Sequence, residues 1–178
     1  MQTRRLFFAL WPDPAQQAAL AQATRGVVER SGGHAVPPEN LHVTLVFVGS
    51  VPDPDINRIE RIAAMVANDV GPEPALITLD TFEHWKKPRI VCLTSERLPS
   101  AQAARIAEML AERLSAAGFA PDRKPWRPHV TVARKVLRGA MQNPERWEWS
   151  FREFALIDSH TGPAGSVYRC RARFALGS

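Results

Sequence analysis

A short motif, His-x-Thr followed by an apolar residue, occurs twice in the chain, as His42-Val43-Thr44-Leu45 and as His129-Val130-Thr131-Val132. Position 129 lies 87 residues beyond position 42, which is close to half of the 178-residue chain. Residues i and i+2 of a strand point to the same face, so each copy would present an imidazole and a hydroxyl on one side. The repeat predicts two pseudo-equivalent lobes, each contributing one such strand to a shared central cleft.

Short strand patterns are mixed with helix patterns along the chain, without a long βαβαβ series. Start and stop signals predict three helices, from Asp13-Pro14 to about Arg30, from Asp53-Pro54 to before Gly71, and from Ser100 to about Ala117. Strands are predicted at 5–10, 41–48, 75–82, 89–93 and 129–133, and in two-residue alternations over 147–152 and 168–174. The pattern favours an α+β fold, bilobal and pseudo-twofold symmetric, with largely antiparallel sheets flanked by helices. Residues 1–178 are expected to form a single domain of two intertwined lobes.

Composition excludes several classes of protein. Two cysteines, Cys92 and Cys170, are too few for a disulfide scaffold or a multi-cysteine zinc site. The early apolar run from Leu6 to Trp11 is too short for a membrane span, and no small-residue cleavage site follows it. We therefore expect a cytoplasmic protein without a membrane partner, and nothing in the sequence demands more than a monomer.

The net charge of +5 is divided unevenly along the chain. Residues 1–84 contain 6 Lys and Arg against 10 Asp and Glu, whereas residues 85–178 contain 17 against 8. A basic half suggests an anionic partner such as a phosphate ester or a nucleic acid. A solubility bias spread over solvated faces would give the same counts, so charge alone leaves both interpretations open.

Two imidazoles and two hydroxyls that face one ligand suit phosphoester chemistry without a metal. Because the unperturbed pKa of histidine is about 6.5, one imidazole can take a proton from water while the other protonates the leaving oxygen. Threonine hydroxyls can hold the non-bridging phosphate oxygens. A single His-x-Thr is more often a satisfied or surface histidine, but two copies at this spacing favour catalysis by His42 and His129. A metal site is not indicated, because the histidines form no i,i+4 helix pair with a carboxylate.

The segments 38–49 (PENLHVTLVFVG) and 127–134 (RPHVTVAR), with 5–10 (RLFFAL) and 154–168, resemble the two-histidine (2H) phosphoesterase superfamily. Within it, the sequence looks most like the RNA 2′,3′-cyclic phosphodiesterase family, formerly called 2′-5′ RNA ligases. The resemblance implies a reaction that opens a terminal 2′,3′-cyclic phosphate to a 2′-phosphate, with no metal or nucleotide cofactor. It implies that His42 is the acid on the leaving 3′ oxygen and His129 the base on water, with Thr44 and Thr131 on the phosphate. The residues by themselves leave open which histidine has which role.

Two arginines near the second motif are further candidates for substrate binding. Arg134 lies five residues after His129, so on a regular strand it would face away, and a bulge or the strand end would have to redirect it. The family resemblance favours a phosphate or strand-backbone contact for Arg134. Arg127 lies two residues before His129 and could share its face, or could be an exposed loop cation.

Aromatic side chains are candidates for stacking on a nucleobase, which contributes about 1–3 kcal/mol per base. Phe47 lies five residues after His42, so packing in the core on the other face is its competing role. Trp85 lies in a basic loop, and Trp126 is a similar candidate. Three arginines of the last strand would share one face, as an RNA backbone track or as charges that prevent edge pairing, namely Arg169, Arg171 and Arg173.

Three functions stay open at this point. The leading one is metal-independent hydrolysis of 2′,3′-cyclic phosphates on RNA ends or small cyclic nucleotides. A 2′-5′ RNA ligase would use the same site in reverse, against competition from water at about 55 M. An RNA-binding module without turnover would need the basic second half but neither histidine.

Overall fold

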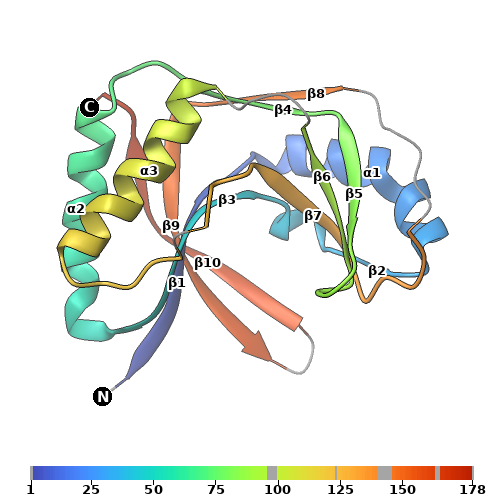
Figure 1. Cartoon of the computed structure of the whole chain (residues 1–178), viewed down its shortest axis with the longest axis horizontal. Helices are drawn as coiled ribbons and strands as arrows, with labels where there is room; N and C mark the ends of the chain where they lie inside the picture. Colours follow the sequence, from blue (N-terminus) through green and yellow to red (C-terminus); the bar gives the residue numbers. More distant parts are fainter. Residues whose placement is uncertain (1, 96–99, 123, 140–145, 163–164, 178) are drawn as a thin grey trace.

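The computed structural model describes residues 2–95, 100–122, 124–139, 146–162 and 165–177, and the described strands form three sheets (Figure 1). The first sheet has the order β10-β9-β1-β3 and consists of Gly165–Ala175, Glu153–Gly162, Thr3–Leu10 and Val43–Pro52. The second has the order β2-β7-β6-β5 and consists of His34–Ala35, His129–Arg134, Ile90–Thr94 and Thr81–Trp85. A third, two-stranded sheet pairs β4 (Ala75–Leu79) with β8 (Trp147–Phe151). The described strand pairs are antiparallel, which confirms the predicted α+β class.

In the described part of the chain, three α-helices cover the two large sheets, namely α1 (Pro14–Ser31), α2 (Ile56–Asp69) and α3 (Ala101–Ala116). α2 and α3 pack on each other and on the first sheet, α2 against β10 and α3 against β3, whereas α1 packs against β7 of the second sheet (Figure 1). α1 thus follows β1 of the first sheet and leads into β2 of the second sheet, which it covers, while α3 connects β6 to β7 of the second sheet yet covers the first. Among the described helices, none is long and apolar enough to cross a membrane.

The helix boundaries follow the local signals closely. The Asp13 carboxylate accepts a hydrogen bond from Gln16 N at 2.8 Å, the Gln16 side chain accepts one from Asp13 N, and Gly32 ends α1 with a φ of 64°. Ser100 caps α3 as predicted. The predicted helix start at Asp53-Pro54 is too early, because Asp53–Asp55 forms a single 3₁₀ turn and α2 begins only at Ile56.

The predicted strand over 75–82 is wrong, because the chain changes sheet at Asp80. β4 ends at Leu79 and pairs with β8, whereas β5 begins at Thr81 and pairs with β6. Asp80 has a low strand propensity, and its N–H donates to the Thr94 carbonyl at 2.8 Å. Apolar patterning continues across this position, so only the strand partners reveal the break.

Candidate active site

His42 lies immediately before β3 in a box of aromatic rings. Trp11 stacks on the imidazole, with ring centroids 4.9 Å apart and planes inclined by 10°. Phe7 and Tyr168, from β1 and β10, approach with centroids 5.1 and 5.3 Å away. The three rings shield the imidazole from water on several sides, so the local environment disfavours its charged form.

Two polar contacts orient the His42 ring. Its Nδ1 lies 2.7 Å from the carbonyl oxygen of Asn40, which can only accept, so Nδ1 carries a hydrogen and Nε2 remains for chemistry. Nε2 lies 3.1 Å from the Thr44 hydroxyl, which donates to the neutral ring and accepts from the charged one. The first motif thus places its imidazole and its hydroxyl side by side, as the sequence predicts.

Burial lowers the pKa of His42 to about 4. The Asn40 carbonyl acts in the opposite direction, because it accepts the Nδ1 hydrogen, while the positive charges of His129 and Arg134 lower the pKa further. The electrostatic effect of His129 on this group indicates that the two motif histidines face one region. In the free protein His42 is therefore unprotonated at neutral pH.

His129 begins β7 and is held in a similar way. Its Nδ1 lies 2.9 Å from the Arg127 carbonyl, so Nε2 again is the free nitrogen. The Trp85 ring packs on the imidazole with centroids 4.7 Å apart. Burial lowers the pKa of His129, the Arg127 carbonyl opposes that, the Arg127 guanidinium lowers it, and the Glu83 carboxylate raises it.

Both motif strands contain a β-bulge at the same motif position. The β1–β3 register skips Leu45, and the β6–β7 register skips Val132, each directly after the motif threonine. An extra residue moves those that follow to the opposite face of the strand. Phe47 and Arg134, each five residues after a histidine, therefore return to the histidine's face and line the same cleft. Phe47 is 46% exposed, so core packing is not its role.

Thr131 faces the cleft, and its hydroxyl lies 3.6 Å from the Cys92 sulfur on the neighbouring strand. Cys92 is buried, and burial raises the pKa of its thiol to about 11. A thiol with this pKa is not a nucleophile at neutral pH. Of these two side chains, the Thr131 hydroxyl is therefore the one that can form hydrogen bonds to a ligand in the cleft.

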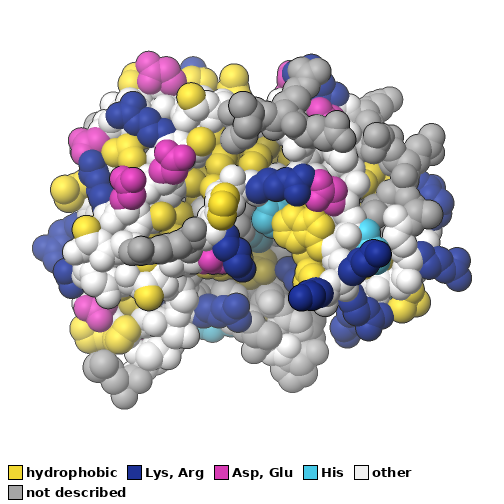
Figure 2. Space-filling view, in the orientation of Figure 1, with side chains coloured by type: hydrophobic (Ala, Val, Ile, Leu, Met, Phe, Trp, Pro, Cys, Tyr) yellow, Lys and Arg dark blue, Asp and Glu magenta, His cyan; other side chains and the backbone are white. Residues whose placement is uncertain are grey.

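A cleft of about 780 Å³ lies between the two large sheets and contains both motifs. Lys and Arg side chains stand around the histidine atoms that are visible near the centre of the face in Figure 2. The residues that carry chemistry in the lining are His42, Thr44, His129, Thr131, Arg5, Arg134, Lys135 and Tyr168. Among the described residues, no group of three or more His, Cys, Asp or Glu is placed to hold a metal ion.

The family model of the 2′-5′ RNA ligase superfamily matches residues 11–163. The chain belongs to the 2′-5′ RNA ligase superfamily. It is 30% identical to the RNA 2′,3′-cyclic phosphodiesterase of Thermus thermophilus, over 97% of this chain and 90% of that protein. It is 29% identical to the protein of the same name from Escherichia coli, over 97% of both chains.

Solved structures share the fold. A phosphoesterase crystal structure superposes with a TM-score of 0.83 at 26% identity, over 99% of this chain and 100% of that one. E. coli LigT complexed with 3′-AMP superposes with a TM-score of 0.84, over 99% of this chain and 100% of that one, at 24% identity. The α+β fold of antiparallel sheets described above is thus shared with solved phosphoesterase structures.

Two predicted substrate-binding residues, Arg127 and Trp85, are not among the residues that line the cleft between the two large sheets. Arg127 is exposed and forms an ion pair with Glu83, and the Trp85 ring packs on His129 with its indole N–H bonded to the same carboxylate. Trp126 is not among the residues that line this cleft either; its ring packs against the hydrophobic core and its indole N–H donates to the Thr44 carbonyl at 2.9 Å. These three side chains contact the motif segments, and a role of any of them in substrate binding stays a prediction.

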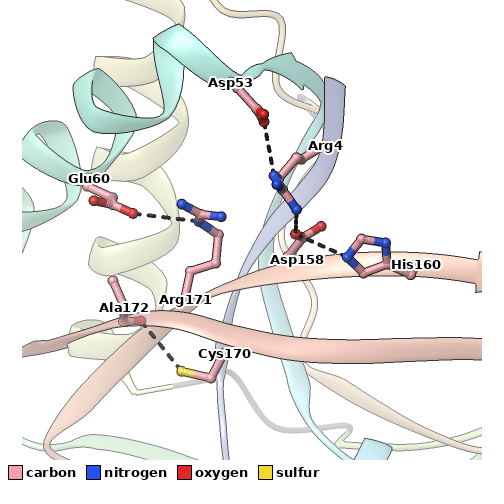
Figure 3. A network of polar contacts seen from close by, with 8 residues as sticks. All are labelled: Arg4, Asp53, Glu60, Asp158, His160, Cys170, Arg171 and Ala172. Atoms are coloured by element: carbon pink, nitrogen blue, oxygen red, sulfur yellow. Dashed lines mark hydrogen bonds and ion pairs between the residues drawn. The ribbon is translucent and has the colours of Figure 1, made fainter. Parts of the chain in front are cut away.

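The three arginines of β10 do not share one face. The β9–β10 register skips Arg171, so the alternation changes phase there. Arg171 extends toward α2 and meets Glu60 at 3.7 Å, as Figure 3 shows, whereas Arg173 pairs with Glu153. On the same face of the sheet Arg4 bridges Asp53 and Asp158, and His160 contacts Asp158 (Figure 3). The predicted shared face of these three arginines, on which both interpretations depended, is therefore wrong.

The sequence analysis did not identify several of the residues that line the cleft. Arg5 and Phe7 belong to β1, and Tyr168 belongs to β10, both of which read only as strand patterns. The alternation along β1 predicts that Arg5 and Phe7 share one face of the strand. It does not predict which face of the strand meets the motifs. Lys135 has a left-handed φ of 55°, an uncommon conformation for a non-glycine residue, and lines the cleft directly after Arg134.

Proposed function

We propose that this protein hydrolyses a terminal 2′,3′-cyclic phosphate of RNA to a 2′-phosphomonoester, and that His42 and His129 transfer the protons. The observation that carries the proposal is that both motifs meet in one cleft with the Nδ1 atom of each histidine bonded to a carbonyl. The curated relatives bear the name RNA 2′,3′-cyclic phosphodiesterase, which supports the same reaction.

The reaction needs one base and one acid. Water attacks phosphorus while its proton passes to Nε2 of His129, the P–O3′ bond breaks, and the 3′ oxygen takes a proton from Nε2 of His42. The products are a 2′-phosphate and a 3′-hydroxyl. Each proton transfer contributes about 10²–10⁴ in rate. Burial lowers the pKa of His129 below its ordinary value, which favours the neutral imidazole that a base requires.

The acid role of His42 depends on the substrate's own charge. At a pKa of about 4, protonation of His42 near pH 6.5 costs about 3 kcal/mol relative to an ordinary histidine. A phosphate monoanion about 4 Å away contributes about 4 kcal/mol at an effective dielectric constant of about 20. Substrate binding can thus offset the burial and charge His42 only when a leaving group is present.

Contacts with the substrate follow from the two bulged strands. Thr44, Thr131 and Arg134 are placed in the cleft with the histidines, where they can hold the non-bridging oxygens of the phosphate. Phe47, 46% exposed at the same cleft, offers an aromatic face to the terminal base. These assignments are part of the proposal.

The proposal extends to the state of the protein in solution. One chain supplies both motifs, and a single buried cluster contains residues of both large sheets, so residues 1–178 are proposed to act as one domain and as a monomer. Cys92 and Cys170 are both free thiols, which is compatible with the reducing cytoplasm.

The direct test uses an oligoribonucleotide with a terminal 2′,3′-cyclic phosphate, incubated with the protein in EDTA. A 2′-phosphomonoester product, resolved from the 3′-isomer, is expected. No phosphomonoester from the wild-type protein would contradict the proposal. His42→Ala and His129→Ala should each lower turnover at least 100-fold.

The same samples separate the alternatives. Joined 2′-5′ product from paired RNA half-molecules, in excess of hydrolysis, would instead indicate a ligase. RNA affinity that is unchanged in both alanine variants, without cleavage of any cyclic phosphate, would indicate a binding module.

A further inference from the structure

Glu83, on β5, is bonded to two neighbours of the second-motif histidine. Its carboxylate forms a two-point ion pair with the Arg127 guanidinium, in which Nη1 lies 2.9 Å from Oε2 and Nη2 contacts Oε1. The indole Nε1–H of Trp85 donates to Oε2 at 2.8 Å. The Glu83 side chain is 27% exposed, so these bonds are partly shielded from water.

Both of those neighbours contact His129 directly. The Trp85 ring packs on the imidazole with centroids 4.7 Å apart, and the Arg127 carbonyl accepts the Nδ1–H at 2.9 Å. The Glu83 carboxylate therefore holds both Trp85, whose ring packs on the imidazole, and Arg127, whose carbonyl fixes the tautomer of the imidazole. Groups that hold a reacting histidine in this manner determine its orientation and its basicity.

We propose that Glu83 is a positioning residue for His129, acting through Trp85 and Arg127 on the orientation and proton affinity of the imidazole. Glu83 is not among the described residues that line the cleft, so we expect it to act without touching the substrate. The inference rests on the proposed function for the role of His129, but the contacts that carry it are independent of substrate.

The charges around His129 give Glu83 a second effect. Arg127 faces the imidazole from the preceding segment and Glu83 from β5, while His42 and Arg134 share the cleft with it. Burial would raise the pKa of Glu83, but the bonds from Trp85 and Arg127 lower it below its ordinary value, so the carboxylate is charged at neutral pH. Its removal leaves Arg127 unopposed beside His129 and disfavours the imidazolium.

Two substitutions test the activity. Glu83→Ala removes all three hydrogen bonds, and Glu83→Gln keeps an acceptor for Trp85 while it removes the charge. Loss of groups that orient a reacting side chain costs about 10–100-fold, so we expect kcat of Glu83→Ala to fall at least about 10-fold, with KM within about 2-fold. The kcat of Glu83→Gln should lie between that of Glu83→Ala and that of the wild type.

Glu153→Gln is the matched control, because Glu153 also pairs with an arginine, Arg173, at a partly exposed position outside the cleft lining. It should retain wild-type kcat. Thermal unfolding of each variant excludes a general loss of fold, and if Glu83→Ala does not fold, Glu83→Gln decides the question.

A substrate-free readout separates this inference from the proposed function. The imidazole resonances of His129, followed by NMR against pH, should titrate at lower pH in Glu83→Gln than in the wild type, and should be unchanged in Glu153→Gln. A wild-type protein without phosphodiesterase activity would overturn the proposed function, yet the titration would still report on Glu83. Wild-type kcat, or an unmoved His129 titration, in the folded Glu83 variants would overturn the positioning role.

Discussion

The aromatic box around His42 makes the stability of this protein depend on pH in a way that one substitution can remove. The pKa of His42 is about 4 in the folded chain and about 6.5 in an unfolded one, so the unfolded chain binds this proton more readily. Stability is therefore lost as the pH falls below about 6.5, and the loss is complete below about 4. The full effect is about 3 kcal/mol, at 1.36 kcal/mol for each pH unit.

His42→Asn removes the titrating group while its amide can still donate to the Asn40 carbonyl. Between pH 7.5 and pH 4.5 the wild type should lose about 2–3 kcal/mol more unfolding free energy than the variant. Urea unfolding at the two pH values measures this, and the comparison cancels the contributions of the titrating groups that do not interact with His42. Trp11→Ala, which lets water reach the imidazole, should remove part of the loss.

An equal loss of stability in the wild type and in His42→Asn would refute the reasoning, because it would mean that the folded chain protonates His42 as easily as the unfolded one. The aromatic rings would then not desolvate the imidazole, and the argument that the substrate's charge must protonate His42 would fail with it.

Four other substitutions probe the cleft and its support. His129→Ala should lower kcat at least 100-fold in an EDTA assay. Thr131→Val should lower kcat about 100-fold with little change in KM, if its hydroxyl binds the phosphate mainly in the transition state. Arg134→Gln should raise KM for RNA and reduce the salt dependence of KM, because a phosphate contact is lost. Trp126→Phe should cost about 1 kcal/mol in urea unfolding, because the Thr44 carbonyl loses its donor.

The sequence predicted the parts of the fold that depend on neighbours in the chain. Asp13 with Pro14, Ser100, and the glycine after α1 define helix ends through bonds within a few residues, and all three appear in the structure. The strands that carry the motifs were likewise visible as apolar, β-branched runs. The change of sheet at Asp80 was not, because a strand's partner is a long-range property.

For the site, the sequence by itself determined which groups we propose to react, since the doubled His-x-Thr motif singles out His42 and His129 without any knowledge of the fold. Only the tertiary structure decided which other side chains join them. At the two bulges, Leu45 and Val132 have no partner residue on the neighbouring strand. The resulting change of phase places Phe47 and Arg134 in the cleft. Alternation along a single strand places those side chains on the wrong face, because the register between strands is set by packing and not by local sequence.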